Sequence, residues 1–297
     1  MIPSYNEYLL IESLKLDDKC NILNEKNLTN EIDKDIKFGI VLATFKLKED
    51  GNVHTARAKY ADSIDFLKDS IGSIKDQTFK NWKLYIVGDA YEGDQEVKDL
   101  LSSLLKPEQY TYHNLSKPGE RDDSSLTSEE KWMTGGITAM NKGLSLADKD
   151  NIKYIARLDH DDKWKPNHLE LIAKAYSQFP DVGFVYTQAR KKVDAPSSNK
   201  KYMFMPEEKE TLDINNKAYV AGQTAHAAVS WRPDLIGKFK YRGAKDQKNT
   251  APKNSKTLGG DVDMFRRVMD KIKESDDIKY MYIPQLTTYI RNRKGKF

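Results

Sequence analysis

Residues 155–164 read IARLDHDDKW, and they place three carboxylates within four positions directly after an apolar run. Carboxylates this close repel one another, so Asp159, Asp161 and Asp162 stay ionised only if a cation or hydrogen-bond donors compensate their charge. The run before them has the length and apolar content of a buried strand. We therefore expect a core strand that ends in an acidic cluster, which either faces open water or binds something positive.

Strands and helices alternate on both sides of this stretch. Strand-like runs occur at 37–45 (KFGIVLATF), 83–88 (KLYIVG), 110–115 (YTYHNL) and 182–190 (VGFVYTQAR), and the first has the continuous apolar content of a strand covered on both faces. Helical periodicity separates them, at 64–74, at 94–105, in one helix from Trp132 to Ala147, and at 165–179. This alternation predicts an α/β fold with a mainly parallel central sheet flanked by helices. Ligands of such sheets bind at the carboxyl ends of the strands.

The last third of the chain has a less regular pattern. It offers candidate strands at 201–206 (KYMFMP), 226–232 (HAAVSWR) and 278–284 (IKYMYIP), and a helix at 261–275. No clear linker separates it from the part before. We predict an acidic N-terminal extension, 1–36, and one catalytic domain, 37–297. The domain has a nucleotide-binding half, 37–190, and a mixed acceptor-side half, 191–297, with a basic tail.

Composition narrows the class of protein. The 297 residues are 38% hydrophobic and 32% charged, and the mean hydropathy is -0.74. The longest apolar run covers roughly eight residues, where about 20 are needed to cross a bilayer, and the start of the chain lacks a signal-peptide pattern. We expect a cytoplasmic protein that is not an integral membrane protein. A single cysteine, Cys20, forms no internal disulfide, and we expect it to be a small buried residue.

The charge distribution gives little support for nucleic-acid binding. The net charge is only +4, although residues 238–256 carry seven Lys or Arg against the single Asp246. Such a run favours a solvated loop over an anion-binding role. We therefore expect no nucleic-acid partner.

The acidic cluster suits a hard divalent cation. The GxxxxGK[ST], GxGxxG and HExxH motifs are missing, which argues against a P-loop NTPase or a dinucleotide oxidoreductase. Mn2+ and Mg2+ prefer oxygen ligands, and Mg2+ takes one or two carboxylates while substrate phosphates supply the rest. Asp159 and Asp161, two apart at a strand end, point the same way if the chain stays extended. The alternative is a polar turn that caps the next helix.

Six segments, in order, carry a resemblance to a known family. They are VLATF, SIKDQTFKNW, KLYIVGD, GGITAMNKGLSLA, IARLDHDD followed by W and P, and GGDVDMFRR. With them the chain resembles glycosyltransferase family 2, whose members are nucleotide-sugar enzymes of the GT-A fold, over nearly all of 37–291. The resemblance implies a GT-A-like fold and a nucleotide-sugar donor.

The resemblance also implies roles for residues at the donor site. Thr44 packs beside the nucleotide base, and Asp89 accepts a hydrogen bond from it, which for uracil is the ring N–H. Asn141 falls in a segment that contacts phosphate or ribose, although Met140 stands where the family usually has Arg, which puts that contact in doubt.

The acidic cluster acquires separate roles in the same way. Asp159 corresponds to the residue near the ribose and is a possible metal ligand, Asp161 is the metal ligand of the DxD motif, and Asp162 supports them. We expect Mn2+ or Mg2+ as the cofactor.

Asp261 falls where the family has its catalytic base, before a helix. Two glycines, Gly259 and Gly260, allow close backbone approach, and a helix N-terminus favours the ionised carboxylate that a base requires. Asp261 also suits a helix N-cap, and both roles are compatible. The family usually has Glu at position 260, so Asp263 remains the alternative base.

Two further groups of residues complete the expectations. Arg291, with Arg293 and Lys294, is a candidate to fold over the donor diphosphate. The five histidines have no metal-ligand spacing, and His226, in the acceptor-side half, is the one we would substitute first.

These residues predict a metal-dependent, inverting glycosyltransferase. It moves a sugar from a nucleotide sugar, with UDP favoured by family habit, to a hydroxyl of a glycan, lipid-linked or protein acceptor. Two alternatives stay open. A sugar-phosphate nucleotidyltransferase would share an acidic nucleotide site, and a non-catalytic module would bind anionic polymers through residues 238–256.

Overall fold

The computed structural model describes residues 20–22, 27–46, 63–192, 202–205, 224–250, 257–292 and 296–297. Their strands are β1 (Cys20–Ile22), β2 (Phe38–Thr44), β3 (Trp82–Gly88), β4 (Tyr110–Asn114), β5 (Tyr154–Arg157), β6 (Lys163–Trp164), β7 (Val182–Lys192), β8 (Tyr202–Met205), β9 (Val229–Trp231) and β10 (Lys279–Ile290). Their α-helices are α3 (Ser63–Lys75), α4 (Asp94–Leu104), α5 (Ser128–Thr134), α6 (Ile137–Lys149), α7 (His168–Gln178), α9 (Pro233–Ile236), α10 (Ala244–Thr250) and α11 (Gly260–Glu274).

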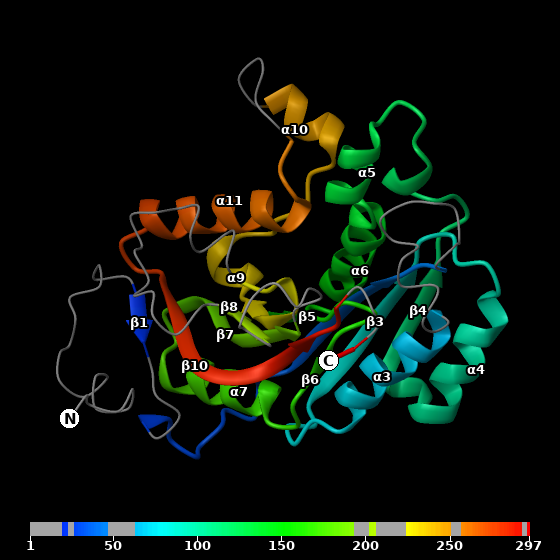
Figure 1. Ribbon diagram of the computed structural model, residues 1–297. Coiled ribbons are helices and arrows are strands. Elements are labelled where there is room, and N and C mark those ends of the chain that lie inside the picture. Colours follow the sequence, from blue (N-terminus) through cyan, green and yellow to red (C-terminus); the bar gives the residue numbers. More distant parts are fainter. Residues whose placement is uncertain are drawn as a thin grey trace.

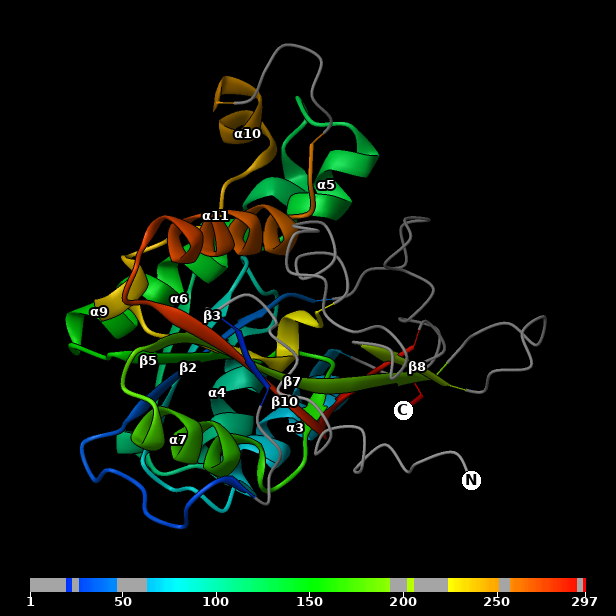
Figure 2. The ribbon, with the colours of Figure 1, turned by 90° about the vertical axis from the view of Figure 1, so that its left-hand side faces the viewer.

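The strands form one sheet in the order β1-β10-β7-β9-β5-β2-β3-β4, with β6 on β10 and β8 on β7. The run β5-β2-β3-β4 is parallel throughout. Helices α3, α4 and α7 lie on one face of the sheet, and α6, α9 and α11 on the other (Figures 1 and 2). The predicted α/β fold with a mainly parallel, helix-flanked sheet is confirmed.

The central strands read as continuous apolar runs because both of their faces are covered. In β2, Phe38, Ile40 and Leu42 pack into a core that includes Leu67 of α3. Val41 points the other way and packs into a second core that includes Met140 of α6. This two-sided burial holds the carboxyl ends of the strands, and the side chains that follow them, in fixed positions.

The C-terminal region makes the sheet mixed. Strand β9 lies between β5 and β7 and is antiparallel to both, so that Trp231 is opposite Ile155 and Phe184. Trp231 is 1% exposed and belongs to the core. Strand β10 runs parallel to β7 and continues six residues beyond the predicted end at Pro284, to Ile290. Register shifts around Pro284 explain this, because a bulge accommodates a residue that cannot donate to the ladder.

One predicted helix is two. The periodicity from Trp132 to Ala147 indicates a single helix, but α5 and α6 are separated by Gly135 and Gly136. Gly136 has a φ of 88°, in the left-handed region that glycine adopts without strain. The prediction of one continuous helix is wrong because this backbone turn interrupts it. The turn places Gly135 and Gly136, directly before α6, in the wall of a cavity at the carboxyl ends of the strands.

Parts of the predicted N-terminal extension belong to the sheet and its core. Strand β1 pairs with β10 in parallel, and Ile36, 1% exposed, packs in the same core as β2. The boundary at residue 37 stays a prediction, and the side chain of Cys20 lies outside the described residues.

Residues 238–250 of the basic segment are described by the structure, and 251–256 lie outside the described residues. Lys238 pairs with Asp148 at 2.6 Å, Lys245 pairs with Asp123 at 2.7 Å, and Lys248 pairs with Glu130. Carboxylates therefore compensate much of its charge. No helix in the described ranges combines the length and the apolar content that a membrane crossing requires.

Candidate active site

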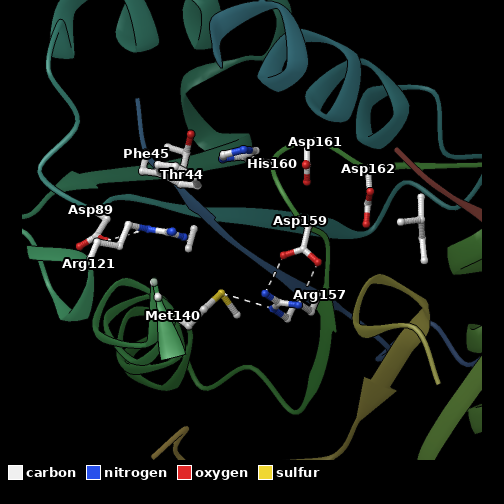
Figure 3. Close-up of a pocket in the computed structure, with 14 residues that line it drawn as sticks. Thr44, Phe45, Asp89, Arg121, Met140, Arg157, Asp159, His160, Asp161 and Asp162 are labelled. Atoms are coloured by element: carbon white, nitrogen blue, oxygen red, sulfur yellow. Dashed lines mark hydrogen bonds and ion pairs between the residues drawn. The ribbon is translucent and has the colours of Figure 1, made fainter. Parts of the chain in front are cut away.

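A cavity of about 230 Å3 opens at the carboxyl ends of β2, β3 and β5. Its lining brings together four residues predicted from different parts of the chain, Thr44, Asp89, Asp159 and Asp161 (Figure 3). The wall is completed by Ala43, Phe45, Arg121, Gly135, Gly136, Met140, Arg157, His160, Asp162 and Ile290. Asn141, Asp261 and Arg291 are not part of this lining.

Asp89 and Thr44 present buried polar atoms to the cavity. The Asp89 side chain is 1% exposed, and its Oδ1 accepts a hydrogen bond from the Gly119 N–H at 2.8 Å. Within the described part of the chain, neither Asp89 Oδ2 nor Thr44 Oγ1 has a hydrogen-bond partner. Buried polar atoms are normally satisfied, so these two mark where a ligand with hydrogen-bonding groups fits.

Arg121 is the residue at this end of the cavity that sequence reasoning missed. It lies in the 3-10 turn Glu120–Asp122, its Nε is 3.5 Å from Asp89 Oδ2, and its guanidinium lies 3.6 Å from the centre of the Phe45 ring (Figure 3). Burial lowers the pKa of Arg121, and nearby carboxylates, Asp89 first, oppose this. Its sequence context, GERDD, looks like any charged turn and gave no signal.

Arg157 compensates part of the negative charge of the acidic cluster. This buried arginine ends β5, and its two terminal nitrogens contact the Asp159 carboxylate at 2.7 and 3.2 Å. Its Nε lies 3.5 Å from the sulfur of Met140 (Figure 3). The protein itself therefore supplies a cation to one of the three carboxylates. Within the strand-like run IARL, Arg157 gave no separate signal.

The turn that carries Asp161 and Asp162 is braced from behind. Ser70 of α3 donates a hydrogen bond to the Asp162 carbonyl at 2.6 Å. The main-chain N–H of Arg291 donates to Asp162 Oδ1 at 3.0 Å, and its Nε–H donates to the Asp161 carbonyl at 2.9 Å. The Arg291 guanidinium also pairs with Asp69 at 2.6 Å. In this structure Arg291 supports the turn, and its contact with a donor stays a prediction. Arg293 and Lys294 lie outside the described residues.

The carboxylates could bind a metal ion only if a bound substrate supplied the remaining ligands. Within the described ranges, no group of three or more His, Cys, Asp or Glu side chains is placed to hold a metal. Asp159 and Asp161 do line one cavity, and one or two carboxylates suffice where phosphates supply the remaining ligands. Because Arg157 already contacts both oxygens of Asp159, Asp161 is the better candidate ligand.

Asp261 lies in the first turn of α11, where its Oδ1 accepts the Val262 N–H at 2.9 Å. Although its side chain is 35% exposed, burial raises the pKa of Asp261. The Val262 N–H and Arg157 oppose the rise, and Asp159 adds to it. Arg157 thus interacts with carboxylates on both sides of it.

Asp263, the alternative base, is enclosed by arginines. Its side chain is 4% exposed, and it pairs with Arg242 and, at 3.0 Å, with Arg267. Both carboxylate oxygens are engaged. This arrangement suits a structural ion pair that ties α11 to the loop before α10.

Asn141 does not reach the cavity because both ends of its amide bind the main chain of Tyr241. Its Nδ2 donates to the Tyr241 carbonyl at 2.9 Å, and its Oδ1 accepts the Tyr241 N–H at 2.9 Å. A contact between Asn141 and a nucleotide stays a prediction. The residues are 100 apart, so no local pattern indicates this pairing.

His168 and His160 are placed by packing and hydrogen bonding. His168 is fully buried, stacks on Trp164 with ring centres 4.3 Å apart, and contacts Thr287 Oγ1 through Nδ1 at 2.7 Å. Burial lowers the pKa of His168 to about 3. His160 lines the cavity, with its ring centre 4.8 Å from that of Phe45. His54 lies outside the described residues.

Comparison with known proteins agrees with the predicted family. The model described as "Glycosyl transferase family 2" matches residues 60–232, more than half of the chain. An uncharacterized glycosyltransferase of Acanthamoeba polyphaga mimivirus is 31% identical over 209 residues, 70% of this chain and 78% of that protein. A putative teichuronic acid biosynthesis glycosyltransferase of Bacillus subtilis, TuaG, is 32% identical over 106 residues, 36% of this chain and 34% of its own length.

Solved structures share the fold. A crystal structure of S. aureus TarS matches with a TM-score of 0.53 and 13% identity, over 86% of this chain. The match spans only 60% of the TarS chain. The chain therefore has the GT-A fold of these structures. The chain belongs to glycosyl transferase family 2, as the sequence predicts.

Proposed function

We propose that the protein is a metal-assisted, inverting glycosyltransferase that moves a sugar from a nucleotide sugar to an acceptor hydroxyl. The observation that carries the proposal is the convergence of polar side chains from the ends of β2, β3 and β5 on one cavity. Family membership supports transfer of a sugar, and the cavity lies where α/β sheets bind their ligands.

The nucleotide base lies against Asp89 and Thr44. Asp89 Oδ2 is a buried acceptor and takes a ring N–H, such as that of uracil. Another TarS structure, in complex with UDP-GlcNAc, matches with a TM-score of 0.51, which supports UDP as the first nucleotide to test. The ribose lies beside Asp159, and the diphosphate lies toward Asp161.

Asp261 acts on the acceptor. It takes the hydroxyl proton while the acceptor oxygen bonds to the anomeric carbon and the bond from that carbon to the diphosphate breaks. Attack opposite the leaving group inverts the anomeric centre. Asp161, with Asp159, would hold the Mn2+ or Mg2+, which supplies charge neutralisation for the departing diphosphate. The acceptor hydroxyl belongs to a glycan, a lipid-linked sugar or a protein.

The test is release of nucleoside diphosphate from a panel of nucleotide sugars with Mn2+ present. We expect turnover with one donor class, loss of metal-dependent donor binding in Asp161→Ala, and retained binding without transfer in Asp261→Asn. Pyrophosphate formation from a nucleoside triphosphate and a sugar phosphate would instead identify a nucleotidyltransferase. Absence of both turnover and donor-induced thermal stabilisation would contradict the proposal.

A further inference from the structure

His226 lies between Asp261 and Tyr241, and the proposed reaction does not yet use it. It comes from the 3-10 turn His226–Ala228, directly before β9, and its side chain is 16% exposed. The Phe265 ring stands edge-on to it with centres 5.6 Å apart, and the Tyr241 ring lies at 5.5 Å. Two rings from other elements therefore fix the plane of the imidazole.

Each ring nitrogen of His226 faces one oxygen. Nε2 is 3.0 Å from the Tyr241 hydroxyl, and Nδ1 is 3.9 Å from Asp261 Oδ2. The other Asp261 oxygen accepts the Val262 N–H, so Oδ2 is the one turned toward the ring. The Tyr241 main chain is itself held by two hydrogen bonds with the Asn141 amide, one in each direction. The imidazole thus joins the loop before α10 to α11, and Asn141 ties that loop to α6.

These contacts select one tautomer. Burial and the charge of Arg157 hold the pKa of His226 well below its ordinary value, so the ring is neutral and has one N–H and one acceptor nitrogen. Burial raises the pKa of Tyr241, which keeps its O–H. An ionised carboxylate only accepts, whereas a phenol can donate. The arrangement without a clash has Tyr241 O–H donating to Nε2 and Nδ1–H facing Asp261.

We propose that His226 is a positioning residue for Asp261, whose carboxylate it orients by aiming Nδ1–H at Oδ2 while Tyr241 fixes the tautomer. This inference rests on the proposed function, in which Asp261 is the base. The 3.9 Å separation is about 1 Å longer than a hydrogen bond. Such contacts often tighten only when substrate is bound. Orientation matters because a displacement of about 1 Å in a reacting group costs up to about 100-fold in rate.

A pH profile separates this role from a purely structural one. Four titratable or charged groups act on Asp261 or face it, namely His226, Tyr241, Arg157 and Asp159. Donation from Nδ1–H favours the ionised carboxylate. Its loss therefore moves the acid limb of kcat/KM to higher pH, while a structural defect alone leaves the limb in place.

Two amide substitutions make a matched pair. In His226→Asn the amide nitrogen takes the place of Nδ1 and keeps a donor toward Asp261, whereas in His226→Gln it takes the place of Nε2 and keeps only the Tyr241 contact. We expect kcat to fall about 10-fold or more in His226→Gln and less in His226→Asn, with donor KM unchanged in both. His113→Gln, on β4, is the control for the same substitution and should keep wild-type kcat.

Nitrogen-15 NMR of the imidazole provides a readout that needs no turnover. We expect an Nδ1–H tautomer at neutral pH and a shift of the Nδ1 resonance in Asp261→Asn. An Nε2–H tautomer, or wild-type kcat and acid limb in His226→Gln, would overturn this inference alone. A folded wild-type protein without transfer from any nucleotide sugar would instead overturn the proposed function.

Discussion

Asp89 offers the sharpest test of the donor pocket, through Asp89→Asn. The substitution keeps an oxygen for the Gly119 N–H, which lies 2.8 Å from Oδ1, but it turns the second oxygen into an N–H donor. That donor faces Arg121 in the free protein and would face the base N–H in the proposed complex. In each pairing, a hydrogen-bond acceptor on residue 89 is replaced by a donor, so that two donors face each other.

The cost to stability follows from the Asp89–Arg121 ion pair. At the observed 3.5 Å, opposite unit charges attract by about 5 kcal/mol at an effective dielectric constant of about 20. Solvation lost on burial offsets much of this, and Arg121 remains 22% exposed, so we expect a net loss of about 1 to 3 kcal/mol in the free energy of unfolding. For a chain of 297 residues, a loss of 2 kcal/mol corresponds to a fall of about 3 °C in Tm.

Asp89→Asn should also weaken nucleotide binding, independently of its effect on the free energy of unfolding. Two donors facing each other in a buried site lose about 2 to 3 kcal/mol, or about 30- to 150-fold in the Kd for UDP. Calorimetric titration of UDP with Mn2+, below the Tm of the variant, measures it. Asp150→Asn is the control, because Asp150 binds Lys83 and Tyr85 away from the cavity. A Kd for Asp89→Asn within twofold of wild type would refute the assignment of the base pocket.

Asp261 and Asp263, both in the first turn of α11, should respond differently to loss of their charge. Because burial raises the pKa of Asp261 and the base acts as a carboxylate, kcat/KM should be full above the raised pKa and fall as pH drops through it, with an acid limb above the ordinary 3.8. Because the pKa of Asp261 is raised, its charged form opposes folding, and Asp261→Asn should keep or raise Tm at pH 7. The same substitution should lower the rate of transfer about 100- to 10,000-fold. A clear fall in Tm would contradict the stability prediction. Asp263→Asn should instead lower stability and keep transfer. We expect the free energy of unfolding, measured in urea, to fall by about 2 to 3 kcal/mol because Arg242 and Arg267 lose their carboxylate partner. Unchanged stability of Asp263→Asn would show that these ion pairs contribute nothing.

The sequence was informative where the structure depends on local pattern. Continuous apolar runs predicted β2, β3, β5 and β7 because those strands are covered on both faces. Carboxyl ends of parallel strands meet at one edge of a sheet, so Thr44, Asp89 and Asp161 could be expected in one cavity, and they line it. Each of these predictions needs only the order of elements and the position of a residue within its element.

Features that depend on distant partners could not be predicted. Arg121 faces Asp89 only because the turn after β4 folds back over β3. Asn141 binds the main chain of Tyr241 across 100 residues. The insertion of β9 between β5 and β7 likewise results from long-range pairing that no periodicity encodes. The predicted contact of Asn141 with a nucleotide rests on the family pattern alone. The predicted contact of Arg291 with a diphosphate rests on its charge and its place near the end of the sequence.

A crystal structure with UDP and Mn2+ would show whether this cavity is the donor site. We expect a nucleotide in the cavity at the ends of β2, β3 and β5, with the base edge within hydrogen-bond distance of Asp89 and the diphosphate beside Asp161. We also expect Asp261 to stay clear of the nucleotide, on the side where an acceptor approaches. A nucleotide bound elsewhere on the protein, with this cavity unchanged, would show that the cavity is not the donor site.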